Sequence, residues 1–198
     1  MQVHAPLDHL IGGKTSVRVL RTLSLYPEKE FTGRELASMS GGAPSKVISE
    51  LERFRAIGIV TRKTHGRTHV WKANRQHELF RLLAPVFEQE HKLPDALVQE
   101  LREGVDDERI SRAILFGSFA RGNETPESDI DLLILARRLG EVDAVRAGLD
   151  ALSIRVGTRF GLRLSPIVHA ESDLPRLRKT ALAASIVNDG IVIRGEPL

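Results

Sequence analysis

Two apolar runs separated by a glycine turn constrain this chain more than any other stretch of it. The first run, 113–116, stops at Gly117-Ser118, and the second, 130–135, follows shortly after. A short apolar run that ends at a glycine predicts a buried strand that leads through a tight turn into a short helix. The second run predicts another buried strand.

Two aspartates stand at the start of the second strand. Asp129 and Asp131 are two residues apart, so their side chains leave the same face, roughly 6.5 to 7 Å apart along the strand. Neighbouring carboxylates repel each other, and they are tolerated when a cation lies between them. Mg²⁺ suits such a pair because it takes one or two protein carboxylates and completes its shell with water and phosphates.

The glycine turn before the aspartates can bind an anion such as a phosphate. Gly117 allows a close backbone approach at a helix start, where N–H groups and the Ser118 hydroxyl can face a phosphate. Taken singly, a Gly-Ser pair is a common turn, and two aspartates at a strand start are often only solvated. A chain of this length seldom contains by chance both a Gly-Ser pair and, ten residues later, an Asp-x-Asp motif, so the combination indicates a phosphate and metal site more specifically than either motif alone.

This combination resembles the signature of the DNA polymerase β-like nucleotidyltransferases, in particular the minimal nucleotidyltransferase (MNT) branch. The resemblance implies binding of a nucleoside triphosphate, with ATP favoured, and of Mg²⁺, with two ions possible. The nucleotide-binding residues that it implies are Gly117, Ser118, Arg121 and Ser128. The metal-binding and catalytic residues that it implies are Asp129 and Asp131. For Arg121, a salt bridge that holds the loop is an equally good interpretation.

The chain departs from the family in one position. Active members carry a third carboxylate on the strand after the long helix, and here that strand offers Ser165. Glu171 and Asp173 come close in sequence but are expected past the strand end. A missing general base typically costs about 10² to 10⁴ in rate. The sequence therefore predicts nucleotide and metal binding, with transfer slowed by the missing carboxylate.

Charge is distributed unevenly along the 198 residues. Residues 1–75 contain 13 Lys and Arg against 6 Asp and Glu, residues 76–104 contain 3 against 6, and residues 105–198 contain 13 against 14. The basic excess in the first part can meet an anionic partner such as nucleic acid. The chain has no cysteine and no apolar run near the roughly 20 residues of a membrane span, so we expect a cytoplasmic protein.

Residues 1–75 predict three helices followed by a hairpin. The first helix covers 14–25, the second opens with the capping box Thr32-x-x-Glu35, and the third begins near Pro44 and ends at Gly58. Val47, Leu51, Phe54 and Ile57 are its expected buried residues. Alternating segments 59–62 and 68–72 surround a basic tip at 63–67.

This order resembles the winged helix-turn-helix of MarR- and ArsR-like regulators, which implies binding to double-stranded DNA. The third helix would then face the major groove and the hairpin would lie near phosphates. The same fold also mediates protein contacts, and Glu50 on the exposed face does not favour phosphate binding. The expected DNA-binding residues are Ser45, Lys46, Ser49, Arg53, Arg62, Lys63 and Arg67.

The remaining segments complete the predicted architecture. Residues 76–104 predict a helical connector in one or two pieces, whose apolar stripe packs on one domain or on a second copy of the chain. A helix over 141–160, a strand over 162–168, a helix over 174–188 and a strand over 191–193 follow. The fold class is α/β (α+β): a winged helix-turn-helix at 1–75, the connector at 76–104, and a small mixed-sheet nucleotidyltransferase domain at 105–198.

Three functions remain open from the sequence. The chain is a DNA-binding transcriptional regulator that transfers a nucleotidyl group, or a regulator whose inactive MNT domain only senses nucleotide. As a third alternative, MNT proteins often pair with a HEPN-domain toxin, which implies a toxin-antitoxin role with a protein partner. A homodimer is also compatible with the sequence, and a membrane partner is not expected.

Overall fold

The computed structural model describes residues 13–125 and 127–198, and these form two compact units. The first unit contains the described residues up to Lys92, and the second runs from Leu93 to Leu198. The first twelve residues of the predicted N-terminal domain lie outside the described residues. Each unit has its own buried core, as expected for separately folding parts.

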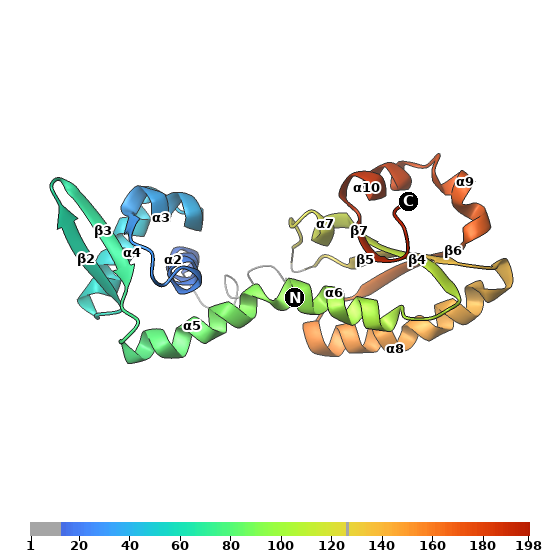
Figure 1. Cartoon of the computed structure of the whole chain (residues 1–198), viewed down its shortest axis with the longest axis horizontal. Coiled ribbons are helices and arrows are strands. Elements are labelled where there is room, and N and C mark those ends of the chain that lie inside the picture. Colours follow the sequence, from blue (N-terminus) through green and yellow to red (C-terminus); the bar gives the residue numbers. More distant parts are fainter. Residues whose placement is uncertain (1–12, 126) are drawn as a thin grey trace. The chain divides into compact units, whose positions relative to one another are not determined.

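The described part of the N-terminal unit contains four helices and a three-stranded antiparallel sheet (Figure 1). Its elements are α2 (Lys14–Leu25), β1 (Phe31–Thr32), α3 (Gly33–Ser40), α4 (Pro44–Ala56), β2 (Val60–His65), β3 (Thr68–Ala73) and α5 (Glu78–His91). The sheet order is β1-β3-β2. Three helices followed by a hairpin are the order predicted for a winged helix-turn-helix.

Local signals set the ends of α3 and α4 as predicted. The Thr32 hydroxyl accepts a 3.2 Å hydrogen bond from the Glu35 N–H, and Gly41 ends α3 with a φ of +63°. Pro44 begins α4, where its missing N–H costs nothing. The core residues Leu36 and Leu51 are fully buried between these helices, so the capping pattern and the apolar spacing agree.

Two details of this unit differ from the prediction. Ile57 is 52% exposed, because α4 ends at Ala56 and the chain turns at Gly58, so Ile59 takes the buried position instead. The wing strands are also longer than predicted. Pairing continues to His65 and Thr68, which leaves only Gly66 and Arg67 as a tight turn.

The C-terminal unit is built on a four-stranded mixed sheet in the order β6-β5-β4-β7. Its elements are α6 (Leu93–Gly104), β4 (Ile110–Phe116), α7 (Gly117–Ala120), β5 (Ile130–Ala136), η1 (Leu139–Glu141), α8 (Val142–Phe160), β6 (Leu164–Ala170), η2 (Glu171–Asp173), α9 (Leu174–Leu177), α10 (Ala181–Asp189) and β7 (Ile191–Arg194). Strands β5 and β6 are parallel, whereas β4 pairs antiparallel with β5 and β7. The α+β fold class is therefore confirmed.

The two faces of this sheet are covered by different helices (Figure 1). Helices α6 and α8 bury one face through residues such as Leu101 and Leu149, which pack on Leu132 and Ile134. Helices α9 and α10 cover the other face, where Leu133 and Leu135 are buried. Asp131 shares the alternation of Leu133 and Leu135, so it belongs to the face with α9 and α10.

Two predicted elements of the C-terminal unit need correction. The helix expected at 174–188 is two helices, because Thr180 has extended backbone angles and its hydroxyl caps α10 by accepting from the Ala183 N–H. The strand expected at 162–168 begins two residues later, at Leu164. The helix expected at 141–160 is present as η1 and α8, and Gly161 ends it with a φ of +64°.

The predicted connector at 76–104 forms two helices that belong to different units. Phe80 and Phe87 of α5 are buried in the N-terminal unit, and Arg21 of α2 donates to Glu90. Leu97 and Leu101 of α6 are buried in the core of the C-terminal unit. Within the described ranges, no helix has the length and apolar character that crossing a bilayer requires.

Candidate functional site

The candidate site forms where β4 ends and β5 begins, and Gly117 is its tightest point. Gly117 has a φ of +81°, which favours glycine. A β-carbon at this position would overlap Asp131 Oδ2 and lie 3.0 Å from Asp131 Cγ. The turn therefore carries the backbone directly against the Asp131 carboxylate.

The two aspartates lie at the edge of the same sheet face. Asp131 is the second residue of β5, with Phe116 opposite it on β4, and Asp129 precedes the strand by one residue. Burial raises the pKa of the Asp131 carboxyl, and the nearby Asp129 charge raises it further, while Arg121 lowers it. Such a pair of partly buried carboxylates is short of positive charge, so the residues present fit a divalent cation.

Ser165 occupies the place opposite Asp131 on the neighbouring strand. The two residues are register partners in the parallel pair of β5 and β6, so their side chains leave the same face. Glu171 and Asp173 follow the last residue of β6, about 20 Å along the strand from Ser165. Neither of them joins the two aspartates.

Glu171 and Asp173 have structural partners instead. Glu171 accepts from Ser111 and, at 3.1 Å, from Arg112 Nε. Asp173 accepts from the Ala170 N–H at 3.2 Å and so caps the turn after β6. Among the residues that the structure describes, no three histidine or acidic side chains cluster as a metal site would need. Among the described residues, the sheet edge therefore brings together two carboxylates, those of Asp129 and Asp131, and not three.

Arg121 and Ser128 both contribute contacts that hold the loop around the aspartates. Arg121 lies 3.8 Å from Asp189 at the end of α10, which matches the loop-holding interpretation of this arginine. The Ser128 hydroxyl accepts from the Thr125 N–H at 2.9 Å, so it stabilises the turn just before Asp129. A contact of either residue with nucleotide stays a prediction.

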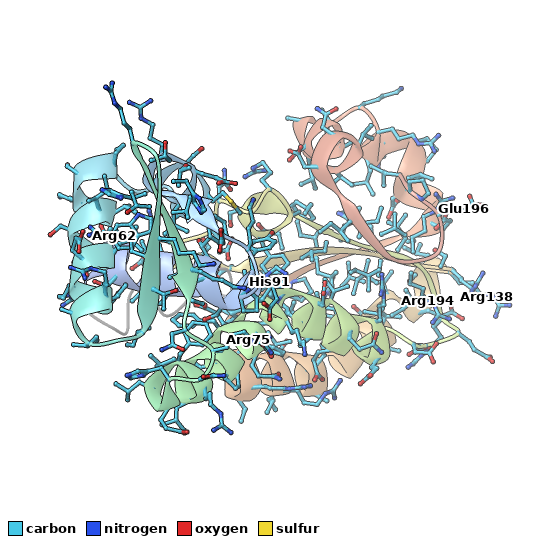
Figure 2. All side chains as sticks on the ribbon, turned by 60° about the vertical axis from the view of Figure 1, so that its left-hand side comes forward. Arg62, Arg75, His91, Arg138, Arg194 and Glu196 are labelled. Atoms are coloured by element: carbon cyan, nitrogen blue, oxygen red, sulfur yellow. The ribbon has the colours of Figure 1, made fainter. Side chains whose placement is uncertain are left out.

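A hollow in this unit lies at the opposite end of the sheet from the candidate site. It encloses about 540 Å³ and is lined by Glu108, Arg109, Arg137, Arg138, Glu141 and Arg194. Figure 2 shows Arg138 and Arg194 at this end of the unit. Arg109 pairs with Asp107 at 2.6 Å and Arg194 with Asp106 at 2.5 Å. Two of the four lining arginines thus have acidic partners, and a third, Arg137, donates to the Glu108 carbonyl.

In the N-terminal unit, every predicted DNA-binding side chain is exposed, but not all are equally available. The exposed set is Ser45, Lys46, Ser49, Arg53, Arg62, Lys63 and Arg67. Arg53 lies 2.5 Å from Glu50, Lys63 lies 2.8 Å from Glu30, and Arg62 pairs with Glu52. Lys46 and Arg67 have no such acidic partner within the described part of the chain.

A hollow of about 530 Å³ lies between α3, α4 and the wing. Its lining includes Arg34 and Arg67, and Arg34 is an exposed cation without an acidic partner among the described residues. The sequence pattern does not single out Arg34, because helical spacing shows only that Arg34 is not in the core. Asp189 and Arg163 carry no sequence signal either, since they come near Arg121 and Asp129 through tertiary contacts alone; Arg163 Nε lies 3.9 Å from Asp129.

Part of the chain is similar to known proteins. Residues 98–191 match the family described as the nucleotidyltransferase domain. A Methanocaldococcus jannaschii protein named as a putative protein adenylyltransferase is 34% identical over 85 residues, which cover 43% of this chain and 79% of that protein. The chain belongs to the nucleotidyltransferase family. A second such protein of the same organism is 25% identical over 100 residues, which cover 49% of this chain and 95% of that protein.

The nucleotidyltransferase also has solved structural neighbours. One is titled as the crystal structure of a toxin-antitoxin with AMP-PNP, and it is 19% identical with a TM-score of 0.35. The similarity covers 52% of this chain and 73% of that chain. At this score it adds nothing to the assignment, which rests on the family match and on the relatives above.

Proposed function

We propose that this nucleotidyltransferase is a DNA-binding regulator whose C-terminal unit binds a magnesium nucleoside triphosphate. The observation that carries the nucleotide site is the contact of the Gly117 turn with the Asp131 carboxylate. Asp129 and Asp131 would hold Mg²⁺, and the turn residues Gly117 and Ser118 would face the phosphates. Both carboxylates would serve a first ion, and a second ion would rely mainly on the triphosphate and water for its ligands.

The chemistry of the family is transfer of a nucleotidyl group to a hydroxyl. The acceptor oxygen attacks the α-phosphorus, the bond to the β-phosphate bridging oxygen breaks, and pyrophosphate leaves while the hydroxyl proton goes to a base or to water. Bound Mg²⁺ would neutralise charge on the triphosphate. The names of the two relatives favour ATP as donor and a protein as acceptor.

We expect this transfer to be slow, because Ser165 faces Asp131 where active members carry a carboxylate. Without that group, deprotonation of the acceptor loses its nearest assistant. Nucleotide binding needs only the Gly117 turn and the two aspartates, so we expect it to persist without a third carboxylate. The protein therefore functions first as a nucleotide sensor and only second as a transferase.

Calorimetry with ATP, GTP, CTP and UTP, with and without Mg²⁺, tests the nucleotide site. We expect binding that requires Mg²⁺ and is lost in Asp131→Asn, while Asp150→Asn, an exposed aspartate on α8, binds normally. Binding that ignores both the metal and the substitution would contradict the proposal. Incubation with labelled ATP and cell lysate, or with a HEPN-type toxin, then tests for a protein acceptor.

DNA binding by the N-terminal unit is the second half of the proposal. It is supported by the order of helices and wing and by the basic excess of residues 1–75. Three exposed cations add to this: Arg34 and Arg67 line one hollow, and Lys46 lies on α4 beside it. Selection from a random duplex pool, followed by anisotropy titrations at several salt concentrations, tests it. The affinity should fall with salt, with a slope of about −0.9 for each phosphate contacted.

A further inference from the structure

The hollow at the far end of the C-terminal sheet gathers four arginines from separate parts of the chain. Its lining comes from the segment before β4, the segment after β5, η1 and the end of β7. Every lining residue is charged, with four cations against two carboxylates. The lining consists of Glu108, Arg109, Arg137, Arg138, Glu141 and Arg194, and Figure 2 labels two of these arginines.

Two of the arginines are held in place by neutral groups. Arg137 Nε donates to the Glu108 carbonyl at 2.7 Å, and Arg194 Nε donates to the Ile110 carbonyl at 3.2 Å. A carbonyl fixes the position of a guanidinium without cancelling its charge. The two Nη groups of each side chain are thus left for other partners, and paired N–H groups are what an arginine uses to bind an oxyanion at two points.

The positive charge of three arginines is only weakly neutralised. Arg137 has no acidic partner among the described residues. Arg138 is 84% exposed along its side chain and comes only within 3.8 Å of Glu141. Arg194 pairs with Asp106, whose side chain is 78% exposed. Because exposed ion pairs are weak, a ligand with several negative charges can compete with both acidic partners.

The other lining groups reduce the charge of the hollow. Arg109 is fully paired, since Asp107 accepts from its Nε at 3.0 Å and from its Nη2 at 2.6 Å. Glu141 accepts from the Arg138 N–H at 3.1 Å, so its carboxylate is fixed at the rim. The Glu108 carboxylate has no cationic partner within the described part of the chain. Glu108 is therefore a group that would repel an anion in this hollow.

The lining also indicates the chemical class of ligand. Among the described residues it includes no aromatic or aliphatic side chain, whereas the hollow beside the wing includes Ile48 and Trp71. A nucleoside base would find no apolar surface here, but guanidinium groups match the oxygens of phosphates. At about 540 Å³, the hollow lies within the size range of small-molecule sites and has room for a chain of phosphates.

We propose that this hollow binds a di- or triphosphate, free or at the end of a larger phosphorylated molecule, through Arg137, Arg138 and Arg194. The site is separate from the proposed nucleotide site, because Asp131 lies at the start of β5 and Arg137 follows its end, about 20 Å along the strand. It binds phosphate through arginines, so it needs no Mg²⁺. The inference does not depend on the proposed function.

Calorimetry of inorganic triphosphate with the full chain, in EDTA, is the first test. We expect one saturable site whose affinity falls as salt is raised, and a dissociation constant at least about tenfold higher in Arg137→Ala. Arg178→Ala is the matched control, because Arg178 is exposed and without an acidic partner among the described residues but lies outside the hollow. Absence of binding, or equal weakening in both variants, would overturn the proposal.

Removal of a carboxylate from the hollow tests the proposal with the opposite sign. Glu108→Gln keeps the carbonyl that holds Arg137 and removes a repelling charge, so triphosphate should bind about two- to fivefold more tightly. Glu103→Gln, at an exposed carboxylate of α6 outside the hollow, should leave the affinity unchanged. This pair remains informative if Arg137→Ala fails to fold. An affinity that Glu108→Gln leaves unchanged or lowers would place the ligand elsewhere and contradict the proposal.

Asp131→Asn separates this site from the proposed nucleotide site. In EDTA, triphosphate should bind this variant as tightly as it binds the unsubstituted chain, and loss of binding would mean that triphosphate occupies the site at Asp131 instead. ATP titrated into the same variant then distinguishes the two sources of the phosphate group. An affinity equal to that of triphosphate, or higher, supports a phosphorylated molecule as the ligand, and a lower affinity supports the free inorganic ion.

Discussion

Glu100 of α6 accepts a 2.7 Å hydrogen bond from Arg155 of α8, although the two residues are 55 positions apart. Arg159 donates to the other carboxylate oxygen at 2.6 Å, and only 6% of the Glu100 side chain is exposed. The Glu100 carboxylate thus links α6 to α8, the long helix that packs on the sheet of the C-terminal unit.

This arrangement predicts an acid-sensitive contribution to stability. Arg155, followed by Arg159, holds the pKa of Glu100 below its usual value. A lowered folded-state pKa stabilises the fold above the unfolded pKa of about 4.3, and this stability is lost as the pH falls through the folded pKa.

Glu100→Gln should therefore lower the free energy of unfolding at pH 7 by about 1 to 3 kcal/mol, because charge-assisted hydrogen bonds are lost. The difference from the unsubstituted chain should shrink and vanish in acid. Urea denaturation between pH 3 and 7 measures it. The control is Glu103→Gln, which alters an exposed carboxylate on the same helix and should change stability little.

Gly117→Ala should be far more damaging than Gly122→Ala. Both glycines have positive φ, +81° and +66°, so both substitutions incur about 1 to 2 kcal/mol of backbone strain. Only at Gly117 does the new β-carbon meet Asp131, whereas at Gly122 it meets nothing within 4 Å. Overpacking adds about 1 to 3 kcal/mol at Gly117.

Thermal unfolding of the two variants measures the difference between these glycines. Adding Asp131→Ala to Gly117→Ala should recover part of the lost stability, because the overlapping carboxylate is gone. Equal losses in the two single variants would show that the turn does not press on Asp131.

Asp131→Asn should leave the metal-free protein as stable as before, or more stable. The substitution removes a partly buried charge that lies beside Asp129, so the repulsion between the two carboxylates disappears. Addition of Mg²⁺ and ATP should raise the melting temperature of the unsubstituted chain but not that of the variant. Equal stabilisation of both proteins by Mg²⁺ and ATP would argue against Asp131 as a ligand.

Elements with strong local signals could be predicted from the sequence. Helix α2 has the predicted bounds, and the Thr32 cap, the Gly161 helix end and the strand that stops at Gly117 are confirmed. These features depend on neighbours within a few residues. Asp129 precedes β5 by one residue, so the predicted spacing of the Asp129 and Asp131 carboxylates along one strand stays a prediction.

Features set by distant residues could not be predicted. Residues Phe31 and Thr32 form a strand only because β3 lies beside them. The apolar pattern of 174–188 is continuous, so it did not predict that the helix is interrupted at Thr180. In the connector, the helical spacing did not tell which apolar side faces the core, and Leu82 is exposed while Phe80 is buried. The spacing of apolar residues predicts that a helix has an apolar face, but it does not predict which other element packs on that face.

Lys46→Ala and Arg67→Ala should affect DNA binding in different ways. Lys46 lies in the first turn of α4, so its loss should weaken binding about 5- to 150-fold and relax the sequence preference. Arg67 lies at the wing turn, so its loss should weaken all sequences alike and reduce the salt slope by about 1. Titrations with the selected and a scrambled duplex check both, and identical sequence-independent losses would count against base recognition by α4.

Ser165→Asp should convert the sensor towards an enzyme. Because Ser165 is the register partner of Asp131, the new carboxylate would join the two aspartates on the same face of the sheet. Three carboxylates repel, so the metal-free variant should be less stable, and its affinity for Mg²⁺ should rise. Transfer from labelled ATP should increase, by up to the factor of about 10² to 10⁴ typical of a general base.

Ser165→Asn is the matched control for this gain, since it adds similar bulk without the charge and should leave transfer slow. Stability without metal, Mg²⁺ affinity and transfer rate are measured on both variants beside the unsubstituted chain. Rapid transfer by the unsubstituted chain would mean that the proton reaches another acceptor and that two carboxylates suffice. A Ser165→Asp variant that gains Mg²⁺ affinity without gaining rate would instead place the deficiency in the recognition of the acceptor hydroxyl.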